Sequence, residues 1–122
     1  MIYTGIDIIE INRIVDVKKR FNKRFLKKIY TDQEILYCKD RGPQLASRFA
    51  AKEAMMKALG TGIRGIPWKS IEVTRERGKA PKILLHGAAK KKAKELKIHN
   101  IALSLSHSKK FAVASVIVET HT

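Results

Sequence analysis

A chain of 122 residues is long enough for one folded domain, which we expect to span residues 1–122. Its 26 Lys and Arg against 11 Asp and Glu give a formal net charge of +15, which favours acidic or phosphorylated partners. A single cysteine, Cys38, excludes an intramolecular disulfide. No apolar run approaches the roughly 18 residues of a membrane span, and no signal-type segment opens the chain. The sequence therefore predicts a cytoplasmic protein without a membrane partner.

The N-terminal stretch, residues 2–9, is rich in β-branched residues and predicts a strand. Side chains alternate along a strand, so Asp7 lies on the face opposite to Ile6 and Ile8. A carboxylate inside such a run is costly unless it has a partner. Asp7 is therefore a candidate functional residue.

Helical segments are predicted next. Asn12 is positioned to cap the helix that follows it. Residues 18–28 are densely basic, and apolar residues recur there at every fourth position, which predicts an amphipathic helical segment: Phe21, Phe25 and Ile29. Thr31 and Glu34 have the spacing of a capping box, which predicts a short helix ending near Lys39.

A long helix is predicted from Pro43 to Gly60, because strong helix formers fill this segment and Gly60 suits a left-handed C-cap. Ala50, Glu53 and Lys57 fall on one side of it. Glu53 and Lys57 have the spacing of an ordinary exposed ion pair. The alternative is that Glu53 and Asp7 together hold a hard divalent cation, with Lys57 nearby.

The C-terminal half is predicted to be rich in strands, with one lysine-rich helix at residues 88–97. Strands at residues 71–76 and 82–86 flank a turn, and a second hairpin joins residues 101–105 to 111–118. Residues 112–118 are apolar on both faces, as in a covered central strand. The fold class predicted is α+β, with a largely antiparallel sheet packed on the long helix.

Four motifs in this order resemble the holo-[acyl-carrier-protein] synthase family of 4'-phosphopantetheinyl transferases. They span nearly the whole chain and comprise Gly5–Ile8 with Glu10–Ile14, Arg48–Ala54 with Lys57–Gly62, Gly78–Pro81, and Leu103–Ser108. The resemblance implies transfer of 4'-phosphopantetheine from coenzyme A to a serine of an acidic acyl carrier protein, with release of adenosine 3',5'-bisphosphate, for fatty acid biosynthesis.

The resemblance also implies the roles of individual residues. Asp7, Glu53 and Lys57 match the catalytic residues, and Asp7 and Glu53 match the ligands of Mg²⁺, with Mn²⁺ as an alternative metal. The resemblance does not assign the acceptor of the serine proton. The candidates are a metal-bound water, a carboxylate such as Glu53, and another group.

Further residues match the family's substrate-binding positions. Those expected to bind coenzyme A are Arg48, Lys57, Gly60, Gly62, Ser106, His107 and Ser108. Those expected to bind the carrier protein are Arg13, Arg20 and Arg24. The family implies a homotrimer with active sites between neighbouring subunits.

The competing interpretation is a basic nucleic-acid-binding protein without enzymatic activity. The lysine clusters at residues 18–28 and 90–97 would then neutralise phosphates. The sequence lacks the usual nucleic-acid-binding motifs, and its aromatic residues alternate with core positions instead of forming a stacking platform. We therefore expect no nucleic-acid partner.

Overall fold

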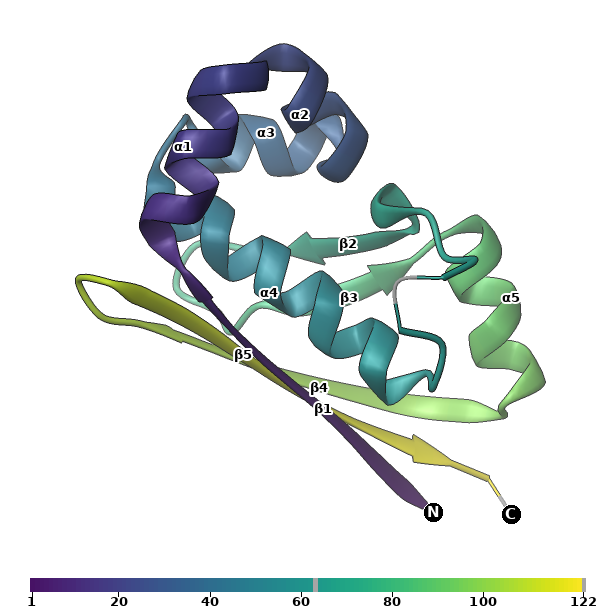
Figure 1. Ribbon diagram of the computed structural model, residues 1–122. Coiled ribbons are helices and arrows are strands. Elements are labelled where there is room, and N and C mark those ends of the chain that lie inside the picture. The colour runs from purple at the N-terminus through teal and green to yellow at the C-terminus, as the bar shows by residue number, and fades with distance from the viewer. Residues whose placement is uncertain (63, 122) are drawn as a thin grey trace.

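The computed structural model describes residues 1–62 and 64–121, and it confirms the α+β class. A three-stranded antiparallel sheet is crossed by one long helix, and a separate two-stranded hairpin and shorter helices lie around that helix (Figure 1). The elements in chain order are β1 (Ile2–Glu10), α1 (Ile11–Phe21), α2 (Lys23–Ile29), α3 (Asp32–Cys38), α4 (Gly42–Ala58), η1 (Trp68–Ser70), β2 (Ile71–Thr74), β3 (Lys82–Leu85), α5 (Gly87–Glu95), β4 (Ile98–His107) and β5 (Phe111–Thr120).

Strand β5 is the central strand of the larger sheet, as its apolar sequence predicted, and the strand order is β1-β5-β4. Its inward residues are fully buried beneath α4, and they are Ala112, Ala114, Val116 and Val118. Asp7 of β1 pairs with Ala114, and His107 of β4 pairs with Ala112. Residues paired directly across an antiparallel ladder share a face, so Asp7 and His107 both lie on the helix-facing side.

Helix α4 packs closely on the sheet because small residues meet at the contact. A Cβ atom on Gly5 would lie 1.8 Å from the carbonyl oxygen of Ala54, so only glycine allows this approach. The helix ends in a Schellman motif: the N–H of Gly60, at φ 77°, donates to Lys57 O, and the N–H of Thr61 donates to Met56 O. The predicted helix and its glycine cap are confirmed, with the helix itself ending at Ala58.

The basic segment after β1 differs from its prediction in two ways. Helix α1 begins at Ile11, directly after the strand, and Asn12 lies inside it and does not cap it. The chain then breaks at Asn22, whose φ of 46° separates α1 from α2. This break turns α2 so that Ile29 is buried while Phe21 stays half exposed, and the two aromatic residues of the segment do not form one continuous stripe.

A buried polar network ties α3, α4 and β2 together. The predicted capping box is present: the N–H of Thr31 donates to Glu34 Oε1, and the N–H of Glu34 donates to Thr31 Oγ1. The fully buried ammonium of Lys52 donates to Glu34 Oε1 at 2.8 Å and to the carbonyl of Ile71. Glu34 Oε2 accepts the N–H of Val73 at 3.0 Å. No described side-chain polar atom that is buried lacks a hydrogen-bond partner.

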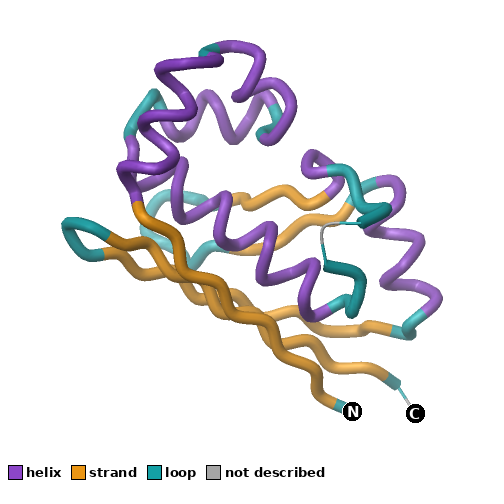
Figure 2. Tube along the Cα trace, viewed as in Figure 1, coloured by secondary structure: helices purple, strands orange, loops and turns teal. Residues whose placement is uncertain are grey.

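The helices lie on one side of the three-stranded sheet, and the other side of the sheet forms a face of the chain (Figure 2). This outer face is apolar and exposed, with Ile2, Ile6, Ile8 and Ile117 between 43% and 65% exposed. The prediction that the central strand is covered on both sides therefore does not hold within a single chain. Among the described helices, none is long and apolar enough to cross a membrane.

Candidate active site

The candidate site lies where β1 crosses α4, and it brings together the three residues predicted to be catalytic. Asp7 points from β1 toward the helix, and Glu53 and Lys57 lie one turn apart on α4. Lys57 Nζ lies 3.0 Å from Asp7 Oδ1, a contact between residues 50 positions apart in the sequence, and it also donates to the carbonyl of Ile6 at 2.9 Å. The amine of Lys57 thus pairs with Asp7 rather than forming the exposed helical pair with Glu53.

The negative charge of Asp7 acts on the carboxyl group of Glu53. Burial raises the pKa of Glu53, and the charge of Asp7 raises it further, while Lys57 and Arg13 act in the opposite direction. Two partly buried carboxylates that interact in this way are stabilised by a cation between them. In the described chain, no group of three or more His, Cys, Asp or Glu side chains is placed to hold a metal. Two carboxylates suit Mg²⁺, which takes oxygen ligands and keeps several waters.

A cavity of about 470 Å³ opens beside Glu53. Its walls come from β1, α1, α2, α4 and η1, and they are mainly apolar, with Arg13 and Lys28 as the basic members. Phe49 and Trp68 form one wall as a stacked pair, with ring centroids 4.8 Å apart. This wall was not predicted from the sequence, although Phe49 precedes Glu53 by four residues and must share its helix face.

A second group of predicted residues lies elsewhere on the chain. Arg48, Ser106 and His107 line a cavity of about 310 Å³ with Tyr37, Gln44, Ser47, Arg75 and Leu105. The guanidinium of Arg48 is buried, lies 4.5 Å from the centre of the Tyr37 ring, and donates to Ser47 Oγ. Arg75 was missed, because nothing in the sequence marks an arginine just after β2 as a neighbour of His107.

The remaining predicted coenzyme A residues have backbone roles in the chain. Gly60 and Gly62 both have positive φ in the segment after α4. Ser108 Oγ accepts the N–H groups of Lys110 and Phe111, so it shapes the turn between β4 and β5. The predicted coenzyme A positions therefore form two groups in one chain: one at the end of α4 and one around His107.

The predicted carrier-binding arginines are all exposed, but they are not equivalent. Arg13 on α1 lines the cavity beside Glu53. Arg20 lies at the end of α1, with its guanidinium 5.8 Å from the centre of the Phe21 ring, and Arg24 follows on α2. Only Arg13 is placed by its contacts at the candidate site.

The similarity of this chain to known proteins includes both groups of residues. The sequence model described as the 4'-phosphopantetheinyl transferase superfamily matches residues 3–116. The chain is 49% identical over 120 residues to the holo-[acyl-carrier-protein] synthase of Koribacter versatilis (strain Ellin345), covering 95% of this chain and 96% of that protein. It is 46% identical over 123 residues to the holo-[acyl-carrier-protein] synthase of Moorella thermoacetica (strain ATCC 39073 / JCM 9320), covering 98% and 95%.

Solved structures show the same similarity. The crystal structure of Helicobacter pylori holo-[acyl-carrier-protein] synthase in complex with coenzyme A has a TM-score of 0.87 and 38% identity, covering 95% of this chain and 99% of that chain. The crystal structure of holo-[acyl-carrier-protein] synthase from Neisseria meningitidis has a TM-score of 0.90 and 34% identity, covering 98% and 100%. The similarity therefore extends over the whole fold.

Proposed function

Because the chain belongs to the 4'-phosphopantetheinyl transferase superfamily, we propose that it acts as a holo-[acyl-carrier-protein] synthase. A serine hydroxyl of apo acyl carrier protein attacks the β-phosphorus of coenzyme A. The bond to adenosine 3',5'-bisphosphate breaks, and the serine proton is released. The carrier gains a 4'-phosphopantetheine arm, which fatty acid biosynthesis uses.

The observation that carries this proposal is the meeting of Asp7, Glu53 and Lys57 where β1 crosses α4. Transfer of a phosphoryl group requires little covalent chemistry from the protein and depends on positioning and on stabilisation of developing charge. An ammonium held by Asp7 and by a backbone carbonyl has a fixed place from which to neutralise that charge. We assign this role to Lys57.

Asp7 and Glu53 are the residues that would hold Mg²⁺. When bound, the ion neutralises phosphate charge and orients the pyrophosphate oxygens. The protein's own part is to keep the two carboxylates on rigid elements, since Asp7 lies within the β1–β5 ladder and Glu53 lies mid-helix. Coenzyme A would be bound from the second group of residues, with Arg48 and His107 facing its phosphates.

The separation of the two groups supports a site shared between subunits. Arg48 and Lys57 are nine residues apart on α4, about 14 Å along the helix axis. The exposed apolar face of the sheet is a surface of the kind that self-association buries. We propose a homotrimer in which the catalytic group of one subunit faces the His107 group of its neighbour.

Carrier binding is proposed at the cavity beside Glu53, because the serine must reach the catalytic group. The exposed arginines on α1 and α2 would attract an acidic carrier and raise the association rate.

Arg13→Glu should therefore raise the KM for carrier about tenfold at low salt and leave the KM for coenzyme A nearly unchanged. Arg77→Glu, at an exposed position in the turn before β3, is the charge-matched control. An equal rise in the KM for carrier and in the KM for coenzyme A would contradict a role of Arg13 in binding the carrier.

Mass spectrometry of apo acyl carrier protein tests the function directly. The carrier is incubated with this protein, coenzyme A and Mg²⁺, beside reactions with a chelator or with the Glu53→Ala variant. A mass gain equal to phosphopantetheine, absent from both controls, would establish the transferase and its metal dependence. No gain with folded protein and several carriers would refute the proposal.

A further inference from the structure

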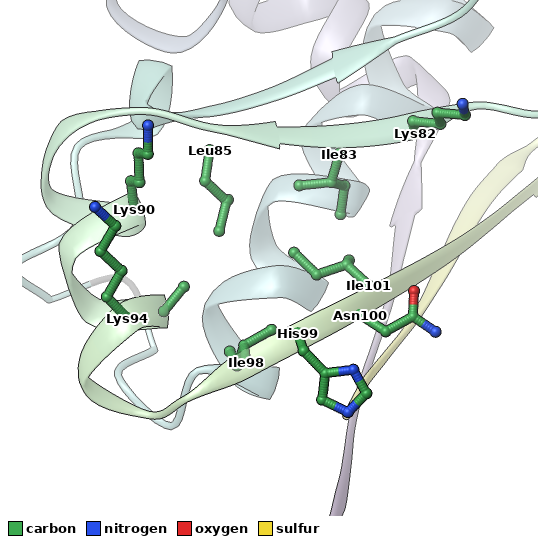
Figure 3. A pocket seen from close by; sticks show the side chains of 10 residues that line it. Lys82, Ile83, Leu85, Lys90, Lys94, Ile98, His99, Asn100 and Ile101 are labelled. Carbon is green, nitrogen blue, oxygen red and sulfur yellow. The ribbon is translucent and has the colours of Figure 1, made fainter. Parts of the chain in front are cut away.

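A groove of about 520 Å³ lies between β3, α5 and β4, and none of the predicted site residues lines it (Figure 3). Its volume falls in the range of small-molecule pockets. The floor is aliphatic, because side chains of β3 and β4 point toward one another across it (Figure 3), namely Ile83, Leu85, Ile98 and Ile101. These side chains pack against the core but stay partly exposed, so the groove presents them to solvent.

An irregularity in β4 builds this floor. Ile98 and Ile101 are three residues apart, a spacing that would place them on opposite faces of a regular strand. The register with β5 shifts between Ile98 and Asn100, so His99 is an extra residue in a β-bulge. The bulge lets Ile98 and Ile101 both pack on the core side of the strand. Together they give a floor about 10 Å long.

Lysine side chains lie at both ends of this floor. Lys90, Ala93 and Lys94 follow the spacing that places residues on one helix face, and the small Ala93 leaves space between the two lysines. Lys90 and Lys94 lie together at one end of the groove, and Lys82 lies at the other (Figure 3). The described lining contains no acidic residue, and these three amines form no ion pair with any described residue. Two like charges at this helical spacing repel each other, and an anion between them would relieve the repulsion.

We propose that this groove binds a medium-chain fatty carboxylate, with its alkyl chain on the aliphatic floor and its carboxylate between Lys90 and Lys94. The floor is formed by one row of side chains from each of two strands, which suits a single straight chain. An uncharged hydrocarbon would leave the two amines without a counter-ion. A cationic amphiphile would be repelled.

Isothermal titration of the whole protein with decanoate, below its micelle-forming concentration, tests the proposal. We expect saturable binding at one site per chain. Replacing both amines, in Lys90→Gln/Lys94→Gln, should weaken binding about tenfold or more. The matched control is Lys91→Gln/Lys92→Gln, which removes the same charge from the same helix at positions outside the groove, and it should leave binding within about twofold.

The floor is tested by a second matched pair. Leu85→Asn should weaken decanoate binding about tenfold, whereas Leu84→Asn should not, because Leu84 points to the other side of β3 and is already 48% exposed. Decan-1-ol should bind more weakly than decanoate, and decyltrimethylammonium should not bind. Equal losses in both lysine pairs, equal binding of the cationic amphiphile, or the absence of saturable binding by folded protein would each overturn the proposal.

Discussion

Lys57 is fixed by contacts with β1 even though its side chain is 53% exposed. An ion pair as exposed as Lys57–Asp7 contributes about 0–1 kcal/mol to folding stability. A cation facing the transferring phosphoryl group contributes much more to the transition state. The two effects can therefore be separated experimentally.

Lys57→Ala should lower kcat/KM by about 100-fold while changing the free energy of unfolding by no more than about 1 kcal/mol. Turnover assays and urea unfolding of the same preparation measure both quantities. Lys91→Ala, which removes an exposed lysine from α5, is the control for loss of charge. Wild-type turnover in folded Lys57→Ala would exclude Lys57 from the reaction.

Lys52 adjoins Glu53 but has the opposite character, since its ammonium is fully buried against Glu34. Burial lowers the pKa of Lys52, and the contact with Glu34 opposes that shift. Lys52→Met leaves the carboxylate of Glu34 buried without its counter-charge, and should cost about 3–5 kcal/mol in unfolding free energy. Lys52→Met/Glu34→Gln should be more stable than the single variant, because it removes the orphaned charge. If the loss of unfolding free energy in the double variant equalled the sum of the losses in Lys52→Met and Glu34→Gln, the two groups would not be coupled.

At the residue scale, the sequence predicted the three residues of the proposed catalytic group but not the contacts that support them. The carboxylate of Asp7 inside an isoleucine-rich strand marked it as a candidate, whereas the helix pattern alone left Glu53 as an ordinary ion-pair residue, and the family resemblance assigned its role. Glu34 was predicted only as a capping residue. Its burial depends on the packing of β2, where the N–H of Val73 reaches it across 39 positions. No local pattern encodes such a contact.

Between elements, Glu72 links α3 to the strands of the hairpin. Thr31 Oγ1 donates to Glu72 Oε2, and Glu72 Oε1 lies 2.9 Å from His86 Nε2. Burial by itself would raise the pKa of Glu72, but the contacts with Thr31 and His86 outweigh it, so the pKa lies below the ordinary value of 4.5. A depressed pKa in the folded state means that ionised Glu72 stabilises the fold.

This stabilisation is complete above the ordinary glutamate pKa, and it is lost as the pH falls through the lower pKa of the folded state. Glu72→Gln should therefore be less stable than the wild type by about 1 kcal/mol at neutral pH, and the difference should shrink below about pH 4.5. Urea unfolding at several pH values measures it. Glu76→Gln, at a side chain 76% exposed, should show little difference throughout. A loss in Glu72→Gln that stays constant into acid would contradict this role.

Element boundaries were predicted best where a residue dictates a local geometry. Thr31 with Glu34 and Gly60 each fixed one helix end, because capping bonds are made within one turn. The break at Asn22 was not predicted, since the spacing of apolar residues continues through it. The chain turns there because Leu26 and Ile29 pack into the core. The core that they join includes residues from elements distant in sequence, so the local pattern does not show the break.

At the scale of the whole molecule, the central strand β5 was predicted to be covered on both sides, but its outer side lies on the exposed face of the sheet, together with the isoleucines of β1. Ile6 and Ile8 are 63% and 64% exposed, which leaves an apolar surface on the outer face of the same strand that carries Asp7. In the proposed trimer this surface is buried, and the Lys57 group of each subunit works with the His107 group of its neighbour. Such an arrangement makes a quantitative prediction about mixed trimers.

Lys57→Ala and His107→Ala should each be weakly active alone, because every site of a trimer then lacks one residue. When the two variants are unfolded and refolded together, a site formed by an intact Lys57 and a neighbour's intact His107 appears in about a quarter of random pairings. Turnover of the mixture should therefore rise well above that of either variant. The control is Lys57→Ala refolded together with the doubly substituted Lys57→Ala/His107→Ala chain, which cannot form a complete site. If each site lay within one chain, the mixture would only average the two variants, and the shared site would be excluded.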